Sequence, residues 1–376
     1  MKKAKLFTAS ALALGTIVAL AACGNSGGNT TDSSKGAAGG KTDAEHSVAI
    51  VTDIGGVDDR SFNQSAWEGL QEWGKENKIE RGVGGYDYLQ SDDASQYTTN
   101  LDSAVSNGFQ TIFGIGYLLA DPITAAAQAN PDVNFGIIDS VLEGDNIVSA
   151  TFADHEASYL AGVAAAYTTK TNKVGFIGGE EGPVIDRFEA GFRLGVHDAA
   201  KELGKEIDVT EEYAASFGDP AKGKSLAAAM YQGDVDVIFH ASGGTGAGVF
   251  QEAKALNQEL NEADLESDKV WVIGVDSDQD AEGAYKTKDG KDDNFTLCST
   301  LKEVGAAIKD ISNRAMEDKF PGGEHLEYTL KDGGVELTEG YLTDDAKTAV
   351  SKAKDGIKDG SIEIPETPDE LAKDVK

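Results

Sequence analysis

Short apolar, β-branched runs alternate with helical patterns along most of the chain, and this rhythm restricts the possible folds more than any other feature. Several runs are apolar at consecutive positions, as in parallel strands that are buried on both faces of a sheet. Strands are predicted at 48–52, 111–115, 133–138, 147–152, 174–177, 235–239, 270–275 and 296–299. Helices are predicted at 62–76, 156–167, 187–203, 248–260, 303–319 and 345–358. This alternation predicts a doubly wound α/β architecture.

The folded part is too long for one sheet of this kind, so the sequence predicts two α/β lobes. A strand that runs directly into a helix at 145–156 marks a crossing point between the lobes. The predicted organisation is lobe 1 at 47–152 and about 278–318, lobe 2 at 153–277 and about 319–360, and a charged C-terminal tail at 361–376.

The N-terminal residues have the pattern of an export signal. Lysines precede a short apolar stretch, so residues 1–22 are predicted to be a signal peptide. The segment 20–24 (LAACG) resembles the lipobox of bacterial lipoproteins, in which the cysteine takes a diacylglycerol. Cys23 is therefore expected to anchor the protein to the outer face of the cell membrane, the alternative being a plain secretory signal with an incidental cysteine. Residues 23–46 are rich in glycine and polar residues and are predicted to be a flexible tether.

The composition excludes several classes of function. Acidic residues outnumber basic ones by 65 to 33, for a net charge of −32, and such a surface repels nucleic acids. The chain has two cysteines, Cys23 and Cys298, and this number excludes a disulfide framework and a CxxC motif. Cys298 lies in an apolar run and is expected to be a buried core thiol. No HExxH motif occurs, and the one GxSxG match, at 24–28, lies in the glycine-rich segment before the first predicted strand and not at a turn from a strand to a helix. The sequence therefore indicates a protein that is not an enzyme and has no cofactor or metal.

Chemically useful residues follow the first predicted strand, and in open α/β sheets ligands bind outside the carboxyl ends of the strands. Asp53 comes directly after strand 48–52, and Phe62 and Asn63 open the next helix, with Ser61 as the expected N-cap. An aromatic ring at a cleft can stack on a planar ligand, and Asn can both donate and accept hydrogen bonds. The alternatives are a hydrophobic staple for Phe62 and ordinary turn chemistry for Asp53.

Further acids stand after other strands. Asp139, Asp154 and Asp276 each follow a predicted strand. A single such Asp is commonly a helix cap, but several could converge across a cleft, where carboxylates suit the vicinal hydroxyls of a sugar. Lys302 either supplies the compensating positive charge or is a solvated lysine in the first turn of a helix.

A glycine-rich loop at 240–248 lies between a predicted strand and a helix. A dinucleotide-binding motif starting at Gly244 would need glycine or alanine at position 249, where Val249 stands. Gly243 and Gly244 are therefore expected to bring the backbone close to a neutral ligand.

Several motifs occur together in a distinctive order: 53–63, ending in DRSFN, then GIG at 114–116, DHEASYLAG at 154–162, the 242–248 loop and VIGVD at 272–276. In this the chain resembles the basic membrane protein (BMP) family of lipoproteins, also called PnrA-like or Med-type nucleoside-binding proteins. These are substrate-binding subunits of ABC importers. The resemblance implies a type I periplasmic-binding-protein fold, in which two α/β lobes joined by three hinge crossings close on a ligand.

The resemblance also implies a nucleoside ligand, usually a purine nucleoside, permease and ATPase partners, and a monomeric protein. It assigns Phe62 to stacking on the base, with Asp53 and Asn63 hydrogen-bonding the base. It also assigns Asp276 to the ribose hydroxyls, with Lys302 as its basic partner.

Some assignments stay open. The second stacking aromatic is either Phe239 or His240, and both Asp139 and Asp154 are candidates for a further polar contact. The preference between purines and pyrimidines is undecided. A sugar-binding protein of the same fold is the rival interpretation. It would require several tryptophans to stack on sugar rings, whereas the chain has three, two of them within one predicted helix.

Overall fold

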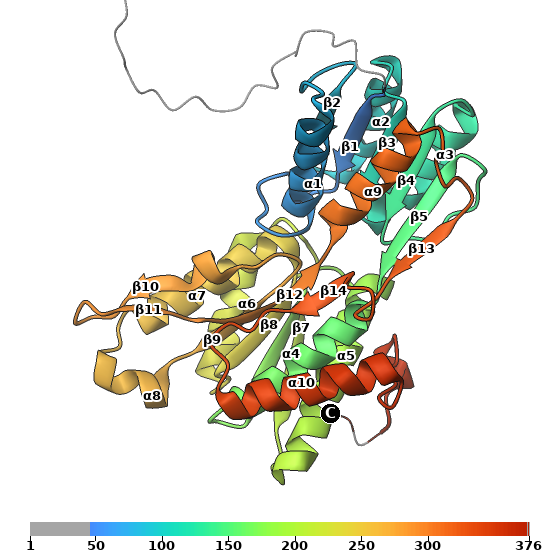
Figure 1. Cartoon of the computed structure of the whole chain (residues 1–376). Helices are drawn as coiled ribbons and strands as arrows, with labels where there is room; N and C mark the ends of the chain where they lie inside the picture. The colour runs from blue at the N-terminus through green and yellow to red at the C-terminus, as the bar shows by residue number, and fades with distance from the viewer. Residues whose placement is uncertain (1–45, 374, 376) are drawn as a thin grey trace, which may run out of the picture. The chain divides into compact units, whose positions relative to one another are not determined.

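The computed structural model describes residues 46–373 and 375, and it contains two six-stranded sheets (Figure 1). The first sheet, in lobe 1, has the strand order β13-β5-β4-β3-β1-β2, and all its neighbouring strands are parallel. Its strands are β1 (Val48–Thr52), β2 (Tyr86–Leu89), β3 (Thr111–Ile115), β4 (Asn134–Ile138), β5 (Ile147–Phe152) and β13 (His325–Tyr328). The helices of lobe 1 are α1 (Phe62–Asn77), α2 (Tyr97–Ser106), α3 (Ala120–Ala129) and α9 (Val304–Met316), with 3₁₀ turns η1 (Ala94–Gln96) and η2 (Tyr117–Leu119).

The second sheet, in lobe 2, has the order β14-β12-β9-β8-β6-β7 and is parallel except for the antiparallel edge strand β14. Its strands are β6 (Lys173–Gly178), β7 (Asp208–Tyr213), β8 (Val237–Ala241), β9 (Trp271–Gly274), β12 (Thr296–Lys302) and β14 (Val335–Leu337). The helices are α4 (Asp154–Thr168), α5 (Pro183–Leu203), α6 (Pro220–Gln232), α7 (Gly246–Asn257), α8 (Leu265–Asp268) and α10 (Asp344–Asp359), with η3 (Gly243–Thr245), η4 (Glu262–Asp264), η5 (Asp280–Gly283) and η6 (Pro368–Glu370).

The chain crosses between the two sheets three times, from β5 to α4, from β12 to α9 and from β13 to β14. Two parallel-dominated sheets linked by three crossings confirm the predicted type I periplasmic-binding-protein fold. The predicted lobe boundaries, however, need correction. The strand β12 pairs with β9 in lobe 2, whereas the sequence placed it in lobe 1, and β13 pairs with β5 in lobe 1, whereas the sequence placed it in lobe 2.

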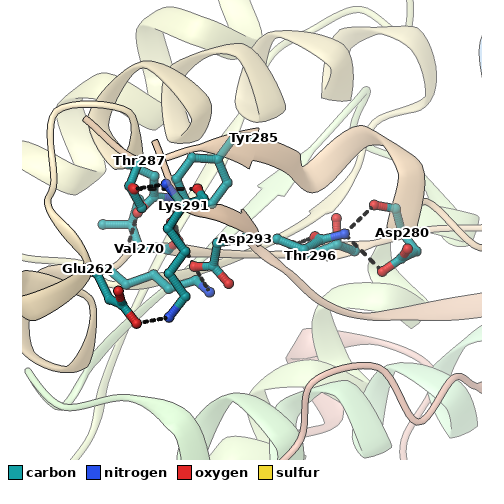
Figure 2. A network of polar contacts seen from close by, with 11 residues as sticks. Glu262, Val270, Asp280, Tyr285, Thr287, Lys291, Asp293 and Thr296 are labelled. Carbon is teal, nitrogen blue, oxygen red and sulfur yellow. Dashed lines mark hydrogen bonds and ion pairs between the residues drawn. The ribbon is translucent and has the colours of Figure 1, made fainter. Parts of the chain in front are cut away.

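A polar network explains why residues 278–296 belong to lobe 2 (Figure 2). Here the hairpin of β10 (Ala284–Lys286) and β11 (Asp292–Asn294) projects from the lobe. Lys269, which precedes β9, contacts Asp293 at 2.7 Å, and the Tyr285 hydroxyl donates to the same carboxylate at 2.8 Å. The Asn294 side-chain amide donates to the carbonyl oxygen of Asp280 at 2.8 Å. These contacts hold the hairpin on its own lobe, and no periodic pattern in the sequence encodes them.

Helix α4 follows the first crossing and packs closely on α5. A Cβ atom on Gly195 of α5 would lie 2.1 Å from the Tyr159 carbonyl oxygen, and one on Gly162 of α4 would lie 2.2 Å from the Phe192 carbonyl oxygen. Any larger residue would force the helices apart. The glycine of the 154–162 motif therefore serves helix packing, and α5 is held in place beside the site described next.

Residues 1–45 lie outside the described part of the chain, and with them the predicted signal peptide, Cys23 and most of the tether. Cys298 is buried, as predicted. Within residues 46–373, no helix combines the length and the apolar character needed to cross a bilayer.

Candidate functional site

A cavity lies between the lobes and encloses, together with open solvent, about 510 Å³ of space without protein atoms. Both lobes line it at the carboxyl ends of their strands, as the rule for open α/β sheets requires. Its wall in lobe 1 comprises Asp53, Gly55, Asp59, Phe62, Asn63, Gly116, Tyr117 and Asp139. Its wall in lobe 2 comprises Val184, Ile185, Phe188, Phe217, Ala241, Ser242, Gly243, Val275, Asp276 and Lys302.

Most of the predicted site residues meet in this cavity. Those that line it are Asp53, Phe62, Asn63, Asp139, Gly243, Asp276 and Lys302. Asp154, Phe239 and Gly244 do not line it. Gly244 lies against the backbone of Phe217, where an added Cβ atom would be 3.3 Å from the carbonyl oxygen.

Two of the acids take the same backbone conformation in different lobes. Asp139 follows β4 with φ 67°, and Asp276 lies two residues after the end of β9 with φ 63°. Asp tolerates this left-handed region better than most residues other than Gly and Asn. The turn brings each carboxylate to the end of its sheet, so the two acids converge from opposite lobes.

Lys302, the last residue of β12, is the centre of a buried charge cluster. Its Nζ lies 2.7 Å from Asp139 Oδ2 and 3.1 Å from Asp154 Oδ1, and all three side chains are at most 4% exposed. Burial lowers the pKa of Lys302, but Asp139, Asp154 and Asp276 outweigh burial and raise it, so the lysine is charged. Asp154 also contacts Arg187 at 3.3 Å. Of the two open candidates, Asp139 therefore lines the cavity, and Asp154 stands behind it as a counter-ion.

Asp276 is partly exposed in the cavity and links the two lobes. Its Oδ2 accepts a hydrogen bond of 2.6 Å from the Ser61 hydroxyl. Desolvation raises the pKa of Asp276 to about 7, against the opposing effects of Lys302 and of the Ser61 hydrogen bond. Ser61 occupies the expected N-cap position of α1, but its hydroxyl makes no capping hydrogen bond to the helix.

Asp59 takes that capping role instead. Its carboxylate accepts hydrogen bonds from the backbone N–H groups of Ser61 (2.9 Å), Asn63 (2.9 Å) and Gln64 (3.1 Å). An acid at a helix N-terminus satisfies amides that have no partner within the helix. Asp59 is not among the predicted site residues. The signal that could have found it is an acid two residues before the expected cap.

Asn63 and Asp53 are hydrogen-bonded to each other. The Asn63 side-chain nitrogen donates to Asp53 Oδ1 at 2.7 Å and to Asp59 Oδ2 at 2.9 Å. Burial raises the pKa of Asp53 to about 7; the Asn63 hydrogen bond opposes this shift, and the nearby charge of Asp59 adds to it. Turn chemistry alone does not describe Asp53, since it is 7% exposed and lines the cavity.

The second aromatic of the cavity is neither Phe239 nor His240. Phe239 is fully buried, and its ring packs against Phe176, Phe188 and Phe192. His240 is also fully buried and is hydrogen-bonded to Gln279 at 3.0 Å.

Two aromatic side chains line the cavity from lobe 2, and the one beside Lys302 is Phe188, in the second turn of α5. Lys302 Nζ lies 5.2 Å from the Phe62 ring centroid and 5.7 Å from that of Phe188, so both rings flank the buried charge. The rule about strand ends does not predict Phe188, because this residue lies within a helix.

Tyr117 of lobe 1 and Phe217 of lobe 2 also meet edge to face, with ring centroids 6.3 Å apart. Both residues line the cavity. Neither was predicted, because each lies in a segment without a clear helical or strand pattern.

Comparisons with known proteins agree with this geometry. The model of the family described as ABC transporter substrate-binding protein, PnrA-like, matches residues 46–369. The chain is 53% identical over 366 residues to the ABC transporter nucleoside-binding protein BmpA of Lactococcus lactis subsp. cremoris, covering 97% of this chain and 99% of that protein. It is 46% identical over 371 residues to the CD4+ T-cell-stimulating antigen of Listeria monocytogenes, covering 98% of this chain and all of that protein.

A solved structure of an ABC transporter solute-binding protein from Aeropyrum pernix K1 superposes with a TM-score of 0.73 at 23% identity, covering 86% of this chain and 94% of that one. This likeness supports the fold. From the family match over 46–369 and the relatives that align along nearly their whole length, we conclude that the chain belongs to the PnrA-like family of ABC transporter substrate-binding proteins.

Proposed function

We propose that the chain captures a nucleoside in the cavity between its lobes and delivers it to the permease and ATPase subunits of an ABC transporter. The observation that carries this proposal is the pairing of aromatic rings from both lobes with carboxylates around one buried lysine. A nucleoside has one planar base for the rings and vicinal hydroxyls for the carboxylates. The 53% identical relative from Lactococcus lactis is itself named a nucleoside-binding protein.

Phe62 and Phe188 are the proposed base-stacking residues. They come from different lobes and line the same cavity, so a planar base can bring the lobes together. Stacking of a base on an aromatic side chain is worth about 1–3 kcal/mol.

Asp276 and Asp139 are the proposed partners of the ribose hydroxyls. A carboxylate can accept two hydroxyl hydrogens, and the charge on Lys302 opposes the rise in pKa that burial causes at Asp139 and Asp276. Hydrogen bonds to charged groups contribute about 1.5–3 kcal/mol each, which together with stacking gives a micromolar or tighter site.

Phosphorylated ligands are disfavoured by the charge of the cavity wall. It carries the carboxyl groups of Asp53, Asp59, Asp139 and Asp276, and Lys302 is its one basic residue among the described residues. A nucleotide would bring further negative charge into this surrounding. The proposed ligand is therefore the uncharged nucleoside.

The sugar-binding alternative finds little support in the aromatic residues. Trp67, Trp73 and Trp271 are all described, and none lines the cavity. Trp67 and Trp73 are buried in the core, and Trp271 contacts Lys269 and Tyr341.

The remaining parts of the proposal concern the setting of the protein. We infer a monomer without enzymatic activity, held on the extracellular face of the membrane by a lipid on Cys23, with residues 24–46 as its tether. The sequence pattern at 20–24 supports the anchor. Radiolabelled palmitate incorporation that is lost in Cys23→Ala would test it.

Calorimetry tests the ligand. The purified full chain is titrated with adenosine, guanosine, inosine, cytidine, uridine, ribose and glucose. We expect at least one nucleoside to bind with a stoichiometry of one and a micromolar or lower Kd. Binding of a sugar in that range, with every nucleoside weaker than about millimolar, would reject the proposal.

A further inference from the structure

The amide of Asn63 is held in one orientation by two carboxylates. Its nitrogen donates one hydrogen to Asp53 Oδ1 at 2.7 Å and the other to Asp59 Oδ2 at 2.9 Å. The flipped amide would place its oxygen against two carboxylate oxygens, which repel it. The nitrogen has no further hydrogen to offer, since a primary amide carries two.

The oxygen of the same amide has no partner. Asn63 is 1% exposed and lines the cavity, and its Oδ1 makes no hydrogen bond to any described residue. A buried acceptor without a partner is costly, so it is expected to meet a donor when the site is filled. Asp53 offers a second acceptor beside it. Both hydrogen bonds that Asp53 accepts from the described residues end on Oδ1, from Gly55 N–H and from Asn63, which leaves Oδ2 for a ligand.

Asp59 is fixed more firmly than either partner. Its Oδ1 accepts from the N–H groups of Ser61 and Gln64, and its Oδ2 accepts from the N–H and the side chain of Asn63. Both oxygens are thus occupied as acceptors. Asp59 therefore presents a stationary acceptor to the Asn63 amide, whether or not a ligand is bound.

The loop that carries these residues is built around their contact. A Cβ atom on Gly55 would lie 2.9 Å from the Asn63 side-chain nitrogen and 3.0 Å from Asp59 Oδ2. A glycine at position 55 allows the backbone to pass directly over the hydrogen bond between the two side chains.

We propose that Asp59 is a positioning residue that fixes the Asn63 amide, so that Asn63 and Asp53 together present acceptor oxygens to the base and select nucleosides whose base carries N–H donors. The inference rests on the proposed nucleoside-binding function and specifies the ligand class further. Adenosine, guanosine and inosine each carry at least one N–H group on the base. Purine riboside has the same ring system and ribose but no such donor, so it is the matched probe.

The experiment is calorimetry of the full chain at pH 8, where Asp53 is mostly ionised, with these four nucleosides. We expect purine riboside to bind at least tenfold more weakly than the tightest of the other three. Equal affinity for purine riboside would overturn the inference while leaving the nucleoside proposal intact. If no nucleoside binds, the proposed function fails and the inference fails with it.

Two variants separate positioning from general damage to the site. Asp59→Asn replaces one acceptor oxygen with an amide NH2 donor and frees the Asn63 amide to flip. The preference over purine riboside should therefore fall at least threefold. The control is Ser61→Ala. Ser61 lies in the same loop, but its hydroxyl donates to Asp276 on the other side of the cavity. This variant should change the affinity for all four nucleosides by the same factor. If Asp59→Asn weakened the binding of all four nucleosides by the same factor, the positioning role would be overturned. If that variant does not fold, the affinities of the unmodified chain for purine riboside and the other three nucleosides still decide whether an N–H donor is required.

Discussion

The negative charge of Asp276 lowers the folding stability of the ligand-free protein, because burial disfavours the ionised carboxylate. Replacing Asp276 by Asn should therefore change the free energy of unfolding. The backbone at this position has φ 63°, a conformation that Asn adopts as readily as Asp, so the replacement causes no backbone strain. The Ser61 hydroxyl can still donate to the amide oxygen. The main change is therefore the loss of one buried charge, which removes its desolvation cost together with its attraction to Lys302 and its repulsion from Asp154 and Asp139.

The size of the effect follows from the pKa. Desolvation raises the pKa of Asp276 to about 7 in the folded chain, whereas an unfolded Asp titrates near about 3.9. A difference of about three pH units corresponds to about 4 kcal/mol at full effect. Water in the open cavity screens this partly exposed group, so we expect Asp276→Asn to stabilise the ligand-free protein by about 1–2 kcal/mol at pH 8.

The sign of the pH dependence is also determined. Because the folded pKa lies above the unfolded one, the protonated acid contributes stability that is complete below about pH 4 and is lost as the pH rises through about 7. The advantage of Asp276→Asn should therefore be near zero at pH 4 and greatest above pH 7. Urea unfolding of both proteins at pH 4, 6 and 8, without ligand, measures it. A variant that is less stable at pH 8, or an offset that is the same at all three values, would refute the reasoning.

Other perturbations have equally definite outcomes. Phe62→Ala should weaken nucleoside binding at least tenfold, measured by calorimetry. Phe239→Leu should lower the urea midpoint but leave the Kd for the nucleoside within threefold. The reverse pattern would contradict the assignment of Phe62 to the ligand and of Phe239 to the core. Lys302→Met leaves buried Asp139 without its cation and leaves Asp154 paired with Arg187 alone. A loss of about 3–5 kcal/mol in unfolding free energy is expected, and an unchanged urea midpoint would contradict the ion cluster. Nucleoside affinity should fall between pH 8 and pH 6, because Asp53 and Asp276 both have a pKa of about 7 and lose acceptor oxygens on protonation. Calorimetry across that range measures this, and a flat profile would contradict it.

The strands at the centres of the sheets were predictable from sequence, and the edge strands were not. The central strands β1 and β3 are buried at every position and have the predicted bounds, because burial on both faces produces an unbroken apolar run. The edge strand β7 (DVTEEY) alternates between exposed and half-buried positions, so it carries no such run. The boundaries failed at β12 and β13, since pairing partners far apart in sequence decide which sheet a strand joins.

The site was predictable where it follows a rule about strand ends. Asp139 and Asp276 were found because the carboxyl ends of parallel strands meet at one edge of a sheet. The rule gives no information on helices, so it missed Phe188 in α5 and Asp59 at the start of α1. It also predicted Phe239 wrongly. Side chains alternate across a sheet, and this one faces the helix-covered core instead of the cavity.

A crystal structure of the chain grown with a saturating nucleoside tests the central claim most directly. The account predicts density for one ligand in the cavity between the lobes, with the base between Phe62 and Phe188, an N–H group of the base at Asn63 Oδ1, and the ribose hydroxyls at Asp276. A ligand bound outside this cavity would contradict the account, and so would a base that lies at Asp276 with its ribose between the two rings.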